Sequence, residues 1–108
     1  MGFFVVNDVH EKRVADGVRV KAITGEKMTM AFFHLEPGAV VLEHSHPHEQ
    51  MGTVLRGSVS LNLGGEERMV GEGEGYHILP NVPHSARCAK GPAQIVEVFS
   101  PPRVDLQE

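Results

Sequence analysis

The sequence predicts an all-β fold in which short strands form a sandwich or a barrel. Apolar and polar residues alternate in several short runs, which is the pattern of half-buried strands. Glycine occurs 12 times and proline 7 times, and these residues separate the runs at short intervals. No stretch of useful length has the period of an amphipathic helix, so crossover helices of a parallel α/β fold are not expected. Together these observations indicate an all-β domain.

Two runs show the alternation most clearly. In 18–24, VRVKAIT, valine and alanine occupy one face, while arginine and lysine lie on the other. In 58–65, SVSLNLGG, apolar residues alternate with serine and asparagine, and the final Gly64–Gly65 pair is typical of a hairpin turn. In chain order, we expect strands at 18–24, 27–35, 38–44, 51–57, 58–65, 76–80, 84–89 and 93–100, with a turn at 66–75.

Composition limits the function classes. The 108 residues predict one domain, 1–108, and are 41% apolar and 22% charged, with a formal net charge of −4. Without a Lys/Arg cluster we expect no nucleic-acid partner. The apolar runs are far shorter than the ~20 residues of a membrane span, so no membrane association is expected. No signal peptide is visible and Cys88 is the only cysteine, which favours a cytoplasmic protein.

The stretch EHSHPHEQ, residues 43–50, is the first candidate site because it holds three histidines. In a strand, His44 and His46 would lie on the same face, where both imidazoles could reach one divalent ion at ~2.0–2.1 Å. Gln50 follows a proline-containing bend and could return to the same centre. His84 could be brought to it across a hairpin-built barrel. The alternative is a polar loop of solvated histidines, because short histidine pairs are common false positives.

The remaining histidines are weaker candidates. His48 could support a ligand from behind or act as a weak extra ligand. His10, His34 and His77 stand alone in strand-like contexts, and we expect them to be surface residues or to have ordinary polar partners. His34 is the least certain of these three.

The run QIVEVFSPPR, residues 94–103, is the second candidate site. Ile95, Glu97 and Phe99 share one face of a strand, and the valines between them share the other. Alternation alone leaves open which face points inward. A Glu97 carboxylate inside the barrel would have a function, because an unpaired buried charge is costly.

A family resemblance adds to this interpretation. The pattern Gly38-x5-His44-x-His46-x3-Gln50-x6-Gly57 resembles the first cupin motif, G-x5-H-x-H-x3/4-E-x6-G. It departs from that motif once, because Gln50 replaces the usual glutamate.

A second pattern follows in the right order. Gly73-x5-Leu79-x-Asn81-x2-His84-x3-Cys88 resembles the second cupin motif, G-x5-P-x-G-x2-H-x3-N. Here leucine, asparagine and cysteine replace proline, glycine and asparagine. Cys88 would follow His84 on the same strand face, either near the metal or, as we expect, as a small buried thiol.

The two motifs, 38–57 and 73–88, imply a single-domain cupin jelly-roll β-barrel, of a type that commonly forms homodimers through its N-terminal strands. They also imply one divalent metal ion inside the barrel, with Zn, Ni, Fe, Mn, Co and Cu all possible. By position, the implied ligands are His44, His46, Gln50 and His84. A neutral Gln50 amide would leave the ion its full charge, which should increase Lewis acidity and reduce metal affinity.

The stretches HSHPHEQ, PNVPHSA and VFSPPR resemble a group of small cupins of pectin and alginate catabolism, which linearise 4,5-unsaturated uronates. This resemblance implies that Glu97, Phe99 and Arg103 are active-site residues. Glu97 would carry a proton, Arg103 would bind the carboxylate of a small sugar acid, and Phe99 would form a wall of the pocket. Glu97 is one methylene longer than the aspartate of that group.

Two other functions remain open at this point. A cupin site of this kind could belong to a metal-dependent dioxygenase, or to a non-enzymatic protein that binds a small ligand. Gln50 weakens a glutamate-assisted dioxygenase. Arg103 together with Glu97 favours a carboxylated substrate over a flat aromatic one.

Overall fold

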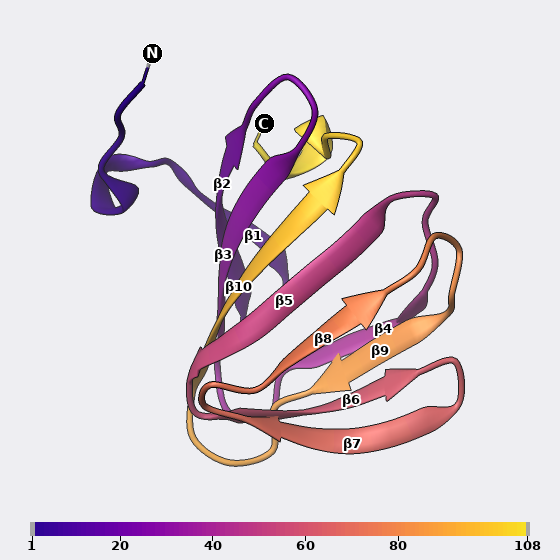
Figure 1. The fold of residues 1–108 in the computed structure, drawn as a ribbon. Coiled ribbons are helices and arrows are strands. Elements are labelled where there is room, and N and C mark those ends of the chain that lie inside the picture. Colours follow the sequence, from indigo (N-terminus) through magenta and orange to yellow (C-terminus); the bar gives the residue numbers. More distant parts are fainter. Residues whose placement is uncertain (1, 108) are drawn as a thin grey trace.

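The computed structural model describes residues 2–107 and confirms the predicted all-β jelly-roll architecture (Figure 1). Two antiparallel sheets face each other. The larger sheet has the strand order β1-β2-β3-β10-β5-β8, and the smaller has the order β4-β9-β6-β7. The strands are β1 (Glu11–Ala15), β2 (Val18–Thr24), β3 (Thr29–Leu35), β4 (Val40–His44), β5 (Glu49–Arg56), β6 (Ser58–Leu63), β7 (Glu66–Gly71), β8 (Gly75–Ile78), β9 (His84–Arg87) and β10 (Ala93–Ser100). Two short 3-10 turns, η1 (Val6–Asp8) and η2 (Val104–Leu106), lie outside the sheets.

The core lies between the sheets and follows from the alternation of each strand. Val18, Val20 and Ala22 on β2 are no more than 2% exposed. From the opposite sheet, Val59 and Leu61 on β6 are also buried. Apolar residues at every second position of both sheets therefore fill the space between them, as in other β-sandwiches.

One predicted turn is wrong. Residues 66–71 form the strand β7, which pairs with β6 along its length through a Gly64–Gly65 hairpin with φ values of 59° and 97°. β7 is an edge strand, and Val70 is its only buried residue. The other positions hold charged residues, the exposed Met69 and Gly71, so the sequence lacks the alternation that marks a strand.

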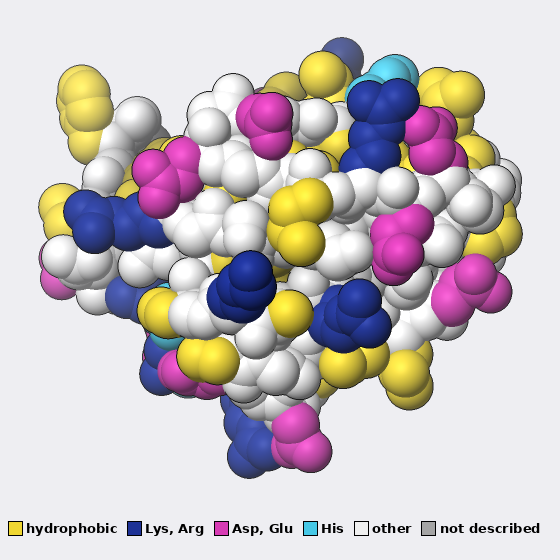
Figure 2. Space-filling view, turned by 90° about the horizontal axis from the view of Figure 1, so that it is seen from below, with side chains coloured by type: hydrophobic (Ala, Val, Ile, Leu, Met, Phe, Trp, Pro, Cys, Tyr) yellow, Lys and Arg dark blue, Asp and Glu magenta, His cyan; other side chains and the backbone are white. Residues whose placement is uncertain are grey.

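The surface seen in Figure 2 carries lysine and arginine side chains interspersed with aspartate and glutamate. No helix among residues 2–107 is long and apolar enough to cross a membrane.

The fold brings both candidate sites to one cavity. β4 ends at His44 and β9 begins at His84, and these two residues are paired across the small sheet. In the large sheet, β10 lies between β3 and β5, so that Glu97 is opposite Gly52 of β5. The two sheets thus supply opposite walls of the cavity.

Candidate functional site

Three histidines meet at the edge of this cavity. His44, His46 and His84 each offer one ring nitrogen, and the three atoms lie within 4.8 Å of one another. The His44 and His84 ring centroids are 4.2 Å apart, and those of His46 and His84 are 5.0 Å apart. His44 is exposed, His46 is half-buried and His84 is buried, so the cluster opens to solvent on the His44 side.

The reason why His46 joins the cluster differs from the sequence interpretation. β4 ends at His44, so His46 lies in the connection to β5 and strand alternation does not place it. Instead, the Asn81 N–H donates to the His46 carbonyl over 2.8 Å. Asn81 has a positive φ of 68°, a conformation that asparagine tolerates better than most residues. This explains how asparagine can stand where the second motif usually has glycine.

Each of the three rings is oriented by a backbone carbonyl close to it in the chain. Nδ1 of His44 and of His84 each lies 2.8 Å from the carbonyl oxygen two positions earlier. Nδ1 of His46 lies 3.2 Å from the carbonyl oxygen two positions later. A carbonyl can only accept, so Nδ1 of His44 and of His84 carries the proton, and the Nε2 of each presents a lone pair.

These residues fit a divalent transition metal ion. His84 Nε2 is buried and has no hydrogen-bond partner among the described residues, an arrangement that is costly unless something binds there. Burial lowers the pKa values of His46 and His84, and this favours the neutral imidazole that a metal requires. Imidazole nitrogens and an amide oxygen form a donor set that suits Zn, Ni, Fe, Co or Cu.

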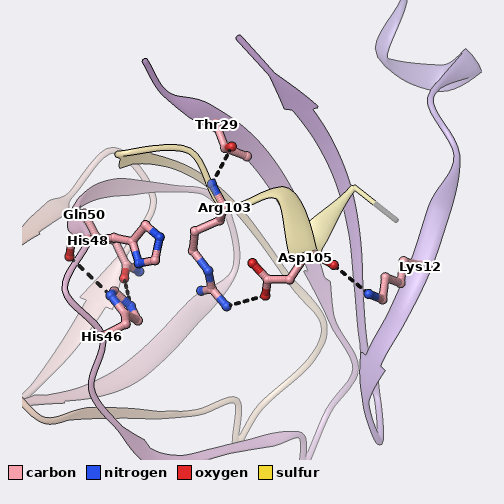
Figure 3. A network of polar contacts seen from close by, with 7 residues as sticks. All are labelled: Lys12, Thr29, His46, His48, Gln50, Arg103 and Asp105. Carbon is pink, nitrogen blue, oxygen red and sulfur yellow. Dashed lines mark hydrogen bonds and ion pairs between the residues drawn. The ribbon is translucent and has the colours of Figure 1, made fainter. Parts of the chain in front are cut away.

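Gln50, at the start of β5, belongs to the same cluster. Its side chain is 5% exposed, and its Oε1 lies 3.1 Å from His46 Nε2 (Figure 3). The Gln50 side chain also lies close enough to Glu97 to act on the pKa of that carboxyl. An amide can present its oxygen on one side and donate an N–H on the other, whereas an ionised carboxylate can only accept.

Glu97 faces the cavity. The sequence pattern alone left open which face of this strand points inward, and the structure places the Glu97 face inside. It shares the inward face of β10 with Ile95 and Phe99, which are both buried. The Glu97 carboxylate accepts a hydrogen bond from the Tyr76 hydroxyl. Burial raises the pKa of Glu97, while the hydrogen bond from Tyr76, the nearby Gln50 amide and the charge of Arg103 act in the opposite direction.

The cavity between the sheets has a volume of about 210 Å³. Its walls are mostly apolar, with a few polar groups that converge on the open space. The polar residues that line it come from both sheets and from the chain after β10: His44, His84, Ser85, Gln50, Tyr76, Glu97 and Arg103. A small apolar pocket with a few convergent polar groups is the usual form of a small-molecule site.

Arg103 enters the cavity from the segment between β10 and η2 (Figure 3). Its guanidinium carbon lies 4.9 Å from the centroid of the Phe99 ring, and Nη2 lies 2.9 Å from Asp105 Oδ2. The Arg103 N–H donates to Thr29 Oγ1, and Lys12 Nζ donates to the Asp105 carbonyl over 2.6 Å. The segment is therefore held to β1 and β3, and these contacts fix the backbone from which the Arg103 side chain extends.

The three histidines that stand alone in the sequence have ordinary surroundings. His77 Nε2 lies 2.6 Å from Glu49 Oε2, and His34 Nε2 lies 3.4 Å from Glu36 Oε1. His10 is exposed. His48 lies beside the cluster: its carbonyl oxygen contacts His46 Nδ1, and its ring centroid is 5.3 Å from that of His46. Its Nδ1 is buried and has no hydrogen-bond partner among the described residues.

Cys88 follows the end of β9 and is fully buried. Its thiol donates to the Gly91 carbonyl over 3.1 Å. It packs in the apolar core and is absent from the lining of the cavity, so it is a buried thiol as expected.

Tyr76 and Gly52 are site residues that the sequence interpretation missed. Tyr76 is the only tyrosine, and alternation along β8 places it on the same side as the buried Ile78. That alternation is the signal that could have found it. Four residues are too few for such a pattern to stand out.

Comparison with known proteins agrees with these observations. The sequence profile described as Cupin domain matches residues 31–99. The pectin degradation protein KdgF of Dickeya dadantii (strain 3937) is 28% identical over 106 residues, which cover 96% of each protein. KdgF from Halomonas sp. has a TM-score of 0.90 at 25% identity, covering 98% of both chains. An RmlC-like cupin from Shewanella frigidimarina NCIMB 400 has a TM-score of 0.91 at 22% identity and covers 97% of this chain and 95% of that one.

Proposed function

The chain belongs to the cupin family, and we propose that it is a metal-dependent enzyme that opens the ring of unsaturated uronates. The observation that carries the proposal is the position of Glu97, whose carboxylate faces the cavity that the histidine cluster borders. The similarity to a pectin degradation protein over 96% of the chain supports the substrate class.

His44, His46, His84 and Gln50 would hold the divalent ion, since their donor atoms converge. When bound, such an ion supplies Lewis acidity toward a substrate oxygen. Because Gln50 is neutral where the first motif usually has glutamate, none of the four ligands would carry a negative charge. The ion would then keep its full positive charge.

The proposed reaction is an isomerisation, so no atoms are gained or lost. The C1 hydroxyl gives up its proton as the bond between C1 and the ring oxygen breaks, which leaves a C1 aldehyde and an enol at C5. A proton then reaches C4 and the enol becomes a ketone. Glu97 would move these protons, because its carboxyl faces the cavity and burial raises its pKa, so that it holds a proton more readily than an exposed glutamate.

Arg103 would bind the uronate carboxylate. Its guanidinium lines the cavity and carries a fixed positive charge in a planar fork that matches a carboxylate. Phe99 is 1% exposed, lies beneath the guanidinium and restricts its position. A carboxylated sugar would therefore enter with one end at Arg103 and the other toward the histidine cluster.

An ultraviolet assay tests this function. The substrate is the unsaturated monouronate released by a pectate or alginate lyase, whose conjugated double bond absorbs until the ring opens and the enol becomes a ketone. We expect the metal-loaded protein to remove the absorbance and a chelator to prevent the loss. Stable absorbance with a fully metallated protein would contradict the proposal, and would favour a dioxygenase or a binding protein.

A further inference from the structure

Tyr76, Gly52 and Glu97 form a row across three neighbouring strands of the large sheet. Gly52 on β5 is paired with Tyr76 on β8 and with Glu97 on β10. Neighbouring strands are about 4.8 Å apart, so Tyr76 and Glu97 stand on strands roughly 10 Å apart. The Tyr76 hydroxyl nevertheless reaches Glu97, because the phenol lies over the glycine between them.

Gly52 is required for space and not for its backbone conformation. It is absent from the glycines that have positive φ. A Cβ atom at this position would lie 2.6 Å from the Tyr76 oxygen, 2.7 Å from its Cζ and 2.9 Å from Glu97 Cγ. Any other residue would therefore push the phenol and the carboxylate apart.

The Tyr76 hydroxyl also has little choice of partner. Burial, followed by the charge and the hydrogen bond of Glu97, raises the pKa of Tyr76 far above its usual value. The phenol consequently keeps its proton and remains a hydrogen-bond donor. Among the described residues, the side chain that accepts this hydrogen bond is Glu97. Tyr76 also lines a second cavity, between β6, β7 and β8.

We propose that Tyr76 is a positioning residue, and that the glycine at position 52 leaves the space through which its hydroxyl holds the Glu97 carboxylate. This inference rests on the proposed function, in which Glu97 carries protons. Tyr76 and Gln50 approach the carboxylate from β8 and β5, so they limit its rotation and aim it into the cavity. The effect belongs to the chemical step and not to substrate or metal binding.

Tyr76→Phe tests the proposal because it removes only the hydroxyl. We expect kcat on the unsaturated monouronate to fall by about ten- to hundredfold, the scale of a misplaced catalytic group. KM, metal content and melting temperature should stay close to those of the wild type. Gly52→Ala keeps the hydroxyl but displaces it, and should lower kcat in the same way.

Ser60→Ala is the matched control. Ser60 Oγ donates to Glu67 Oε2 over 3.2 Å on the outer side of β6, so this variant also loses a hydroxyl-to-carboxylate bond, but away from the cavity. Its kcat should equal that of the wild type. The proposal would be overturned if kcat were unchanged in Tyr76→Phe. It would also be overturned if kcat fell as much in Ser60→Ala as in Tyr76→Phe.

A spectroscopic readout separates this proposal from the function on which it rests. Tyr76 is the only tyrosine and the chain has no tryptophan, so tyrosine fluorescence reports on this one ring. A carboxylate bound to the hydroxyl quenches that fluorescence, and we expect Glu97→Gln and Gly52→Ala to increase it. Inactivity of the wild type on uronates would overturn the proposed function alone. Equal fluorescence in the wild type and in both variants would overturn the positioning of Glu97 by Tyr76.

Discussion

The two walls of the cavity are organised differently. On the histidine wall, each ring is oriented by a carbonyl only two residues away in the chain. On the opposite wall, the Glu97 carboxylate depends on Tyr76 and Gln50, which stand on two other strands. The comparison shows that local contacts can orient the rings of a metal site, whereas the surroundings of the acid require the correct register of three strands.

Removal of a metal ligand should have the largest effect. We expect His84→Ala to lower metal affinity by more than about 100-fold, since the loss of even an outer partner costs 10–100-fold. The barrel should still fold, because the orienting contacts of the other two histidines do not involve this side chain.

Metal content after dialysis, measured by mass spectrometry, would check the result. His77→Ala is the matched control, since His77 pairs with Glu49 outside the cluster. A fully metallated His84→Ala protein would exclude His84 as a ligand.

Gln50 joins the two walls, so Gln50→Glu should affect both. A carboxylate should bind the metal more tightly, but it would face Glu97 without an N–H to donate, and two adjacent carboxylates resist joint ionisation. We expect kcat to fall by about tenfold or more while metal affinity rises. Metal titration and steady-state kinetics on one preparation would show it. Unchanged kcat would mean that the neutral amide has no function toward Glu97.

The difference between the walls also explains what the sequence could predict. His44, His46 and His84 stand at fixed spacings in two motifs, and the pairing of β4 with β9 together with the Asn81–His46 hydrogen bond brings their nitrogens together. The inward orientation of Glu97 could not be predicted, because apolar residues occur on both faces of β10 and the choice depends on the pairing with β3 and β5.

Two further errors have physical causes. Only Val70 is buried in the edge strand β7, so apolar and polar residues do not alternate along it. The sequence pattern therefore predicts a turn there. Tyr76 reaches Glu97 across Gly52, a contact between residues that are not neighbours in either sequence or strand order. No pattern in a single sequence shows such a contact.

Arg103→Lys should have a smaller effect, on substrate binding alone. Lysine keeps the charge but loses the planar fork and the contact with Phe99. We expect KM for the uronate to rise by about tenfold, the equivalent of one charge-assisted hydrogen bond. The histidine wall should keep its metal. Steady-state kinetics would test this, and a change in kcat without a change in KM would place Arg103 in the chemical step instead.

The smallest effect concerns pH and the metal-free protein. Burial lowers the pKa of His84 from its usual 6.5, so the unfolded chain takes up protons before the folded chain does. The contribution of His84 to the free energy of unfolding should therefore be fully present above pH 6.5. It should be lost as the pH falls through the lowered pKa of the folded state. Melting temperatures between pH 7.5 and 5.5 should fall less in His84→Ala than in the wild type. An equal decline in both would show that His84 does not contribute.

The most direct test compares metal-loaded wild type with metal-loaded Glu97→Gln in the ultraviolet uronate assay, with metal content measured in both. If the histidine wall holds the metal and Glu97 carries the protons, the two proteins should hold equal metal. The variant should lose at least the factor of about 10²–10⁴ that general acid–base catalysis contributes. Equal turnover by two equally metallated proteins would contradict the division between the walls.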